Sequence, residues 1–238
     1  MNKQMRLDKF LAEMNVGSRR EIKEAAKKGR IRVNDSIVKS SDVKISPVID
    51  KVYFDNREIG YVEYEYFIMN KPQGVISATK DDNDTTVVDL IKTNTRNDLF
   101  PVGRLDKDTE GLLIITNDGE MAHRLLSPSN HVKKIYYAKI SGVVTEEDVK
   151  KFSEGLTLAD GTVTKPADLK IIKSGDISEI ELTIVEGKYH QVKRMFASTG
   201  KHVEFLKRIC MGELYLDDNL KTGEYRKLTD DELRRLQK

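Results

Sequence analysis

The first sixty residues combine two helical patterns with short apolar runs that alternate as strands do. Apolar residues recur at helical spacing over 6–15, and Gly17 is placed to end that helix. A second helix should begin after Ser18, because Ser18 and Glu21 have the spacing of a capping box. It should stop at Gly29, and the residues after it alternate as a small hairpin with a further strand at 51–54. The pattern predicts a small αβ module.

The rest of the chain alternates between strands and short helices. The polar residues of 55–65, which include Gly60, predict a domain boundary that separates residues 1–60 from 61–238. Leu112–Ile115 is an unbroken apolar run bounded by Gly111 and a Thr-Asn-Asp-Gly turn, which predicts a buried strand. Further strands are predicted over 66–69, 75–77, 135–140, 167–172 and 177–185. Helices are predicted over 86–91, 120–126, 145–155 and about 192–199, and after Thr229.

Composition excludes several classes of protein. The 238 residues are 38% hydrophobic and 34% charged, with a single cysteine, Cys210, so a disulfide within the chain is impossible. The four histidines lack metal-ligand spacing, and no phosphate-binding loop or dinucleotide fingerprint occurs, so we expect neither a metal nor a cofactor. No apolar run has the length of a membrane span or of a signal segment, which predicts a cytoplasmic protein without a membrane partner.

Charge is distributed unevenly along the chain. Residues 1–60 hold 14 Lys and Arg against 9 Asp and Glu, whereas the remaining residues hold 27 against 30. Within 17–32 there are seven cations and two acids, which is typical either of a solvated helix face or of a surface that follows a phosphate backbone. The candidate phosphate-binding residues are Arg19, Arg20, Lys23, Lys27 and Arg30. A second basic stretch runs over 187–208.

The polar loop over 103–111 leads directly into the predicted strand at 112–115. It carries both cations and carboxylates, and a charged loop held at the edge of a core is a common place for chemistry. By residue type alone, Asp106 and Asp108 are equivalent candidates for a reactive carboxylate.

The string Gly103-Arg104-Leu105-Asp106, followed by Thr109, Gly111-Leu112 and the Thr-Asn-Asp-Gly turn, resembles the signature of the RsuA-type pseudouridine synthases. These enzymes rearrange a uridine in ribosomal RNA. The resemblance implies that Asp106 is the nucleophile, since the motif fixes the aspartate after Arg-Leu. It also implies that Arg104 fills the space that an extruded base leaves.

Three other segments resemble motifs of the same family. Asn70-Lys71-Pro72-Gln73-Gly74 resembles its first motif, so Lys71 is expected at the site floor, among the RNA-binding residues. Lys134-Ile135-Tyr136 resembles the second and implies that Tyr136 stacks on the uracil. The segment 187–197 resembles the third, so Lys193 is expected beside Asp106. The resemblance further implies RNA contacts by Arg194 and Arg208 and a base contact by Met211, where the family usually has Ile.

Residues 5–11, 18–20 and 29–34 resemble the small RNA-binding module first known in the ribosomal protein uS-four. The expected fold class is therefore α+β: a small N-terminal αβ RNA-binding module plus a larger synthase domain with a mixed or antiparallel sheet and flanking helices. The expected partner is small-subunit (16S) ribosomal RNA, free or in a partly assembled small subunit, bound by a monomer. Lys193, where most relatives that act on large-subunit RNA carry Arg, favours the small subunit.

Three alternatives have different consequences. The same reaction on large-subunit (23S) RNA would use the same catalytic residues. A non-catalytic assembly factor would be expected to lack Asp106 or Tyr136, and both are present. A carbohydrate hydrolase using Asp106 and Asp108 as its acid pair would not need the basic stretches.

Overall fold

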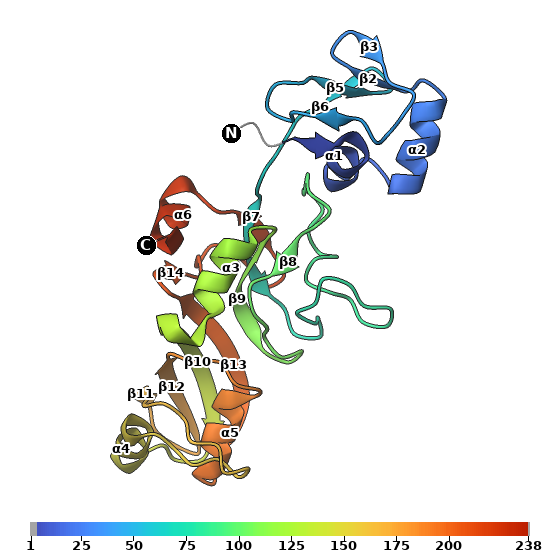
Figure 1. The fold of residues 1–238 in the computed structure, drawn as a ribbon. Coiled ribbons are helices and arrows are strands. Elements are labelled where there is room, and N and C mark those ends of the chain that lie inside the picture. Colours follow the sequence, from blue (N-terminus) through green and yellow to red (C-terminus); the bar gives the residue numbers. More distant parts are fainter. Residues whose placement is uncertain (1–3, 238) are drawn as a thin grey trace. The chain divides into compact units, whose positions relative to one another are not determined.

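The computed structural model describes residues 4–237 of the chain, which form two compact units (Figure 1). The first unit comprises Met1–Glu65 together with Lys92–Leu99. The second comprises Tyr66–Ile91 and Phe100–Lys238. The segment Lys92–Leu99 therefore belongs to the first unit, although the residues before and after it belong to the second.

The first unit packs two helices against small sheets. Helix α1 (Leu7–Glu13) and helix α2 (Arg19–Lys27) match the two predicted helices. The capping box of α2 is confirmed, since Ser18 N donates to Glu21 Oε2 over 2.8 Å and Glu21 N donates back to Ser18 Oγ. A four-stranded antiparallel sheet has the order β3 (Ser36–Ile37), β2 (Ile31–Val33), β5 (Val52–Phe54), β6 (Arg57–Ile59). A separate pair joins β1 (Met5–Arg6) to β4 (Lys44–Ile45).

The segment Lys92–Leu99 is attached to the first unit by a buried arginine. Arg96 Nη2 lies 3.0 Å from Glu13 and 2.5 Å from Asp98, and Arg96 Nη1 donates to the carbonyl of Val62. The carboxylate of Glu65 accepts the backbone N–H of Arg96. A guanidinium can be buried at low cost only where several acceptors surround it, as they do here. No local pattern in the sequence indicates this attachment.

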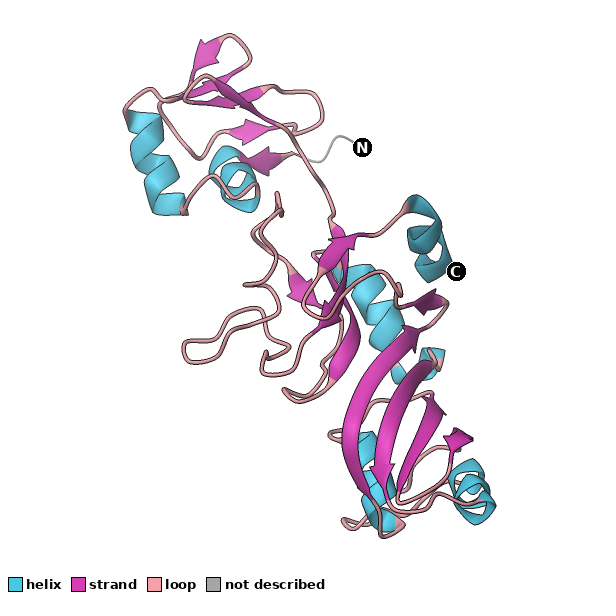
Figure 2. Cartoon of the chain, turned by 180° about the vertical axis from the view of Figure 1, so that it is seen from behind, coloured by secondary structure: helices cyan, strands magenta, loops and turns pink. Residues whose placement is uncertain are grey.

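The second unit is built on one mixed sheet of nine strands within residues 66–237 (Figure 2). The main order is β11 (Asp168–Lys173), β12 (Ile177–Ile184), β10 (Lys134–Ser141), β13 (His202–Met211), β9 (Glu110–Thr116), β7 (Tyr66–Lys71), β15 (Tyr225–Lys227). Strand β14 (Leu214–Tyr215) pairs with β13, and β8 (Phe100–Pro101) pairs with β9. Strands β13 and β9 run parallel to each other and the other pairs are antiparallel, so the predicted α+β class with a mixed sheet is confirmed.

Short helices flank this sheet. They are α3 (Gly119–Leu126), α4 (Glu146–Glu154), α5 (Gln191–Ser198), α6 (Asp230–Gln237) and the 3-10 helix η1 (Pro128–Asn130). Asp118 caps α3 by accepting from Met121 N over 3.0 Å, as its position predicted. Figure 1 shows α4 and α5 at the same end of the β10–β13 sheet. Two side chains of the α5 region, His190 and Lys193, reach Asp106 on the loop that precedes β9.

Two local predictions are wrong. The segment 86–91 forms turns instead of a helix, although Thr86 and Asp89 make the reciprocal hydrogen bonds of a capping box. The residues 75–77 do not form a strand, and Ile76 makes one isolated bridge to Thr86.

Within 4–237, no helix has both the length and the apolar character that crossing a bilayer requires. Over the same range, no three His, Cys, Asp or Glu side chains are grouped as a metal ion would require.

Candidate active site

The loop between β8 and β9 is fixed by buried groups on two sides. Leu105 is buried, and the buried Ser77 hydroxyl donates to its carbonyl over 2.8 Å and accepts its N–H. The ammonium of Lys71 donates to the carbonyls of Asp106 (3.1 Å) and Thr109 (3.0 Å). The loop backbone at Asp106 is therefore held rigidly, which is what a precisely placed reactive side chain requires.

Lys71 is fully buried beneath this loop. Burial lowers the pKa of Lys71 to about 8, although the charges of Asp106, Asp108 and Glu110 oppose that shift.

The carboxylate of Asp106 lies between two basic side chains contributed by the α5 region. Lys193 Nζ lies 3.3 Å from Asp106 Oδ2, and His190 Nε2 lies 3.5 Å from Asp106 Oδ1. Segments more than eighty residues apart in sequence are thus brought together around one carboxylate that is 28% exposed. Lys193 is an ion-pair partner for this carboxylate, which is the group that a nucleophile or a stabiliser of positive charge would supply.

Lys193 is shared by two carboxylates. Its Nζ lies 2.6 Å and 2.8 Å from the oxygens of Asp108, closer than it lies to Asp106. Hydrogen bonding to Lys193 holds the pKa of Asp108 below its usual value. Burial works against the charged form of Lys193, but Asp108 and Asp106 together raise its pKa. Lys193 is therefore a cation at neutral pH.

A row of directly opposed residues crosses four strands of the sheet below this loop. Tyr136 on β10 is paired with Arg208 on β13, Arg208 with Gly111 on β9, and Gly111 with Lys71 on β7. Opposed residues in neighbouring strands point to the same face. The register therefore brings Tyr136, Arg208 and Lys71 onto one face, although they come from three separate motifs.

Gly111 permits the close approach of β9 and β13 in this row. A Cβ at Gly111 would lie 2.2 Å from the carbonyl oxygen of Arg208, and the φ of Gly111 is +104°. Both the space and the backbone conformation exclude other residue types.

The two adjacent tyrosines of β10 face opposite sides, as strand alternation predicts. Tyr137 donates to Glu179 over 2.6 Å, and this hydrogen bond raises the pKa of Tyr137 to about 12. Tyr136 is 8% exposed and belongs to the row with Arg208. Only Tyr136 of the pair faces the side that the motif residues share.

Three residues for which the sequence suggested contact with RNA are buried. Arg208 is 2% exposed, and its Nε donates to the carbonyl of Leu112 over 2.8 Å. Lys71 and Met211 are also buried, and Met211 lies in the apolar cluster of β9, α3 and α6. All three side chains are enclosed by the protein itself. They are in a position to support the site from within.

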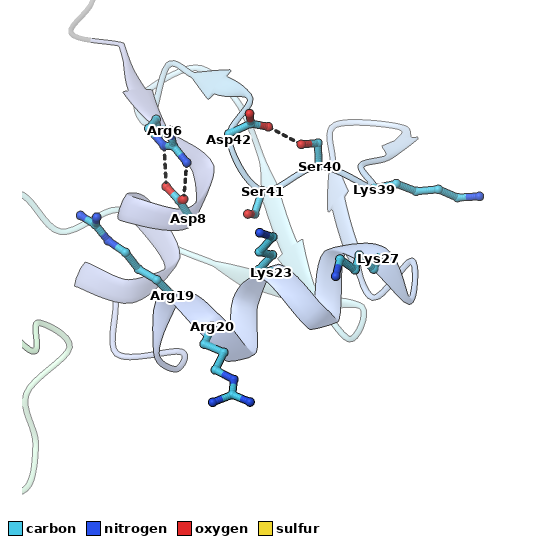
Figure 3. A pocket seen from close by; sticks show the side chains of 10 residues that line it. All are labelled: Arg6, Asp8, Arg19, Arg20, Lys23, Lys27, Lys39, Ser40, Ser41 and Asp42. Carbon is cyan, nitrogen blue, oxygen red and sulfur yellow. Dashed lines mark hydrogen bonds and ion pairs between the residues drawn. The ribbon is translucent and has the colours of Figure 1, made fainter.

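The remaining predicted RNA-binding residues are exposed or partly exposed. Arg104 is exposed on the loop, two residues before Asp106. Arg194, one residue after Lys193 on α5, pairs with Asp160 over 2.5 Å. The cations Arg19, Arg20, Lys23 and Lys27 of α2 line a hollow of about 490 Å³ in the first unit, together with Arg6 and Lys39 (Figure 3).

Arg30 lies outside this hollow and has a carboxylate partner in its own unit. Its guanidinium is paired with Asp55 through two hydrogen bonds and lies over the ring of Phe54 at 4.9 Å. Its charge is therefore already compensated within the unit.

Three residues of the site were not singled out from the sequence. His190 stands three residues before Lys193, in the segment 187–197 that the sequence assigned to the site. That segment could therefore have been used to predict its position beside Asp106. Tyr189 stacks on His190 and is 76% exposed. Ser77 carries no signal in the sequence, because a serine after a turn is usually no more than a solvated residue.

Comparison with known proteins identifies the family. A family model described as RNA pseudouridylate synthase matches residues 65–198, more than half of the chain, and an S4 domain model matches residues 5–47. The chain belongs to the RNA pseudouridylate synthase family. The resemblance that its motifs indicated is confirmed, and the chain is an RNA pseudouridine synthase with an N-terminal S4 RNA-binding domain.

Several relatives match this pseudouridine synthase over nearly their whole length. An uncharacterized RNA pseudouridine synthase of Bacillus subtilis, YtzG, is 46% identical over 96% of this chain and 97% of the relative. Ribosomal small subunit pseudouridine synthase A of Haemophilus influenzae is 40% identical over 98% of this chain and 100% of the relative. A crystal structure of a pseudouridylate synthase, 38% identical, covers 98% of this chain and 99% of that chain with a TM-score of 0.69.

Proposed function

We propose that this synthase isomerises a specific uridine of small-subunit ribosomal RNA to pseudouridine, with Asp106 as its nucleophile. The observation that carries the proposal is the position of the Asp106 carboxylate. It stands on a loop that Ser77 and Lys71 hold rigid, within 3.3 Å of the ammonium of Lys193.

The reaction begins with extrusion of the target base, since an enzyme cannot reach a uridine that is stacked in folded RNA. Arg104 is exposed on the same loop, and we assign to it the space that the base vacates. A guanidinium suits that role because it is flat, stacks on bases and bonds phosphate.

Asp106 then acts at the sugar of the flipped uridine. Its carboxylate either attacks C1′ or stabilises positive charge there while the C1′–N1 bond breaks. The uracil turns, C5 bonds to C1′, and the proton on C5 is removed, so no other reactant is consumed. Lys193 supplies a positive charge 3.3 Å from the Asp106 carboxylate. Tyr136 stacks on the uracil and assists removal of the C5 proton. Arg208 and Lys71 support Tyr136 and the loop from the buried side of the row.

In this proposal the S4 domain docks the RNA. Its exposed cations Arg19, Arg20, Lys23 and Lys27 lie around one hollow, an arrangement that suits a phosphate backbone. The choice of small-subunit RNA rests on the relatives named ribosomal small subunit pseudouridine synthase A, which include the Escherichia coli protein at 38% identity over 96% of this chain. We propose that the enzyme works as a monomer in the cytoplasm.

The test is release of tritium from small-subunit ribosomal RNA labelled at uridine C5. Wild type should release it. Asp106→Asn should release none and should bind RNA with nearly unchanged affinity. Asp108→Asn, the matched control in the same loop, should keep measurable turnover. Release by Asp106→Asn would exclude Asp106 as nucleophile, and release only from large-subunit RNA would replace the proposed substrate.

A further inference from the structure

Tyr189 presents an aromatic ring to solvent beside the active site. The residue is 76% exposed, directly before α5. Its ring stacks on His190 with 3.8 Å between centroids and 18° between planes. His190 covers one face of the ring, so the exposed area belongs to the edge and the other face. A large apolar surface left open at a site of chemistry is typical of a recognition surface.

The turn that carries Tyr189 is held in place by buried hydrogen bonds. The side chain of Gln191, which is buried, accepts from Lys188 N over 2.9 Å and donates to Glu186 Oε1 over 2.7 Å. Arg194 Nη1 donates to the carbonyl of Tyr189 over 3.4 Å. The ring is thus presented by a fixed backbone, which lowers the entropy lost when a ligand stacks on it.

The stacked pair leads to the nucleophile. His190 Nε2 lies 3.5 Å from Asp106 Oδ1, so Tyr189 is separated from the reactive carboxylate by a single ring. Lys188 and Arg194 stand on the same turn and the first turn of α5, each beside a carboxylate of its own unit, Glu186 and Asp160. Aromatic rings interleaved with cations are the usual means of binding unpaired nucleotides, where the rings stack on bases and the cations bond phosphates.

We propose that the open face of Tyr189 is a binding site for an unpaired base that neighbours the target uridine in the RNA strand. The inference rests on the proposed function and deepens it. Arg104 fills the space that the extruded uridine leaves, and Tyr189 stacks on a neighbouring base of the same strand that is itself unpaired. The stacking also fixes the strand relative to Asp106.

The absence of tryptophan from the sequence allows a direct test. Tyr189→Trp in the Asp106→Asn background carries the chain's single tryptophan at the proposed site. We expect transcribed small-subunit ribosomal RNA to quench its fluorescence by about half or more, with affinity within about threefold of the Asp106→Asn parent. Tyr215→Trp in the same background is the matched control, since Tyr215 is 54% exposed on β14. Its fluorescence should change little.

The RNA affinities of further variants distinguish the contribution of the Tyr189 ring from that of its hydroxyl. Tyr189→Ala should weaken binding about 10-fold or more, Tyr189→Phe less than about threefold, and Tyr215→Ala not measurably. An unquenched tryptophan at position 189, or tight binding by Tyr189→Ala, would overturn the inference. The inference would also be overturned if Tyr189→Phe lost as much RNA affinity as Tyr189→Ala. These measurements use an inactive parent, so they are independent of turnover. Failure of tritium release by wild type would count against the proposed function, whereas failure of the parent to bind this RNA would overturn both.

Discussion

The Nζ of Lys193 lies 3.3 Å from Oδ2 of Asp106. The same ammonium makes its shorter bonds, of 2.6 Å and 2.8 Å, to Asp108. One cation therefore bridges two carboxylates on a single loop, and its removal would leave their charges to repel each other.

Lys193→Met should lower kcat for tritium release by about 100-fold, the size typical of losing one charged group that stabilises a reacting centre. RNA affinity should change less than about fivefold, because the ammonium is directed at the loop. Lys193→Arg should retain most of the activity, since it keeps the charge. Lys139→Met, an exposed lysine on β10, is the control. Equal losses in the Met variants at 193 and 139 would show that the Lys193–Asp106 contact has no special role.

Gly111→Ala should lower the free energy of unfolding by about 2 kcal/mol or more and remove most activity. The new Cβ would meet the Arg208 carbonyl at 2.2 Å, so β9 and β13 must separate at the row that joins Tyr136 to Lys71. Urea denaturation and tritium release measure the two effects. Gly119→Ala is the matched control, because nothing lies within 4 Å of the added Cβ there. Similar stability of the two variants would contradict this account of Gly111.

Local patterns were sufficient to predict most of the helices and strands. The capping box at Ser18 and the Asp118 cap predicted where α2 and α3 begin, because both signals lie within four residues of the helix end. The same local reasoning failed at 86–91. There Thr86 and Asp89 make the hydrogen bonds of a capping box, but the chain turns instead of continuing as a helix.

Long-range pairing could not be predicted from local sequence. No spacing in the sequence indicates that Lys193 lies closer to Asp108 than to Asp106. Nor does any spacing indicate that Arg208 on β13 pairs with Tyr136 on the neighbouring strand β10. Arg208 and Lys71 were expected among the RNA-binding residues, and their burial could not be predicted because composition does not reveal it. The assignment of Arg96 to the first unit depends on Glu13, 83 residues away, which no local pattern connects to it.

Lys134→Met should change how stability depends on pH. Burial, with a smaller contribution from Arg208, lowers the pKa of Lys134 to about 8 from 10.5. The folded protein thus loses this proton near pH 8 while the unfolded chain keeps it to about pH 10.5, so wild-type stability should rise with pH in that window. Below pH 8 the buried charge costs on the order of 3 kcal/mol.

The variant should therefore be more stable than wild type at pH 7, and the difference should shrink steadily as pH rises from 8 to 10. Urea denaturation at pH 7, 8.5 and 9.5 measures it. Lys71, whose pKa burial also lowers to about 8, contributes equally to both proteins, so the difference between them isolates Lys134. A difference that is constant across this range would mean that Lys134 keeps the same pKa in the folded protein as in the unfolded chain.

The cations of α2 should govern the salt dependence of RNA binding. Each cation that contacts a phosphate adds about 0.7 to 0.9 to the slope of log affinity against log salt concentration. Arg20→Gln combined with Lys23→Gln should reduce that slope by about 1.5 and should leave kcat at saturating RNA unchanged. Arg30→Gln offers a contrast within the same domain, because Asp55 already compensates the Arg30 charge. It should change the slope by less than about 0.5. Equal slopes for the two variants and wild type would exclude the α2 surface as the RNA-docking surface.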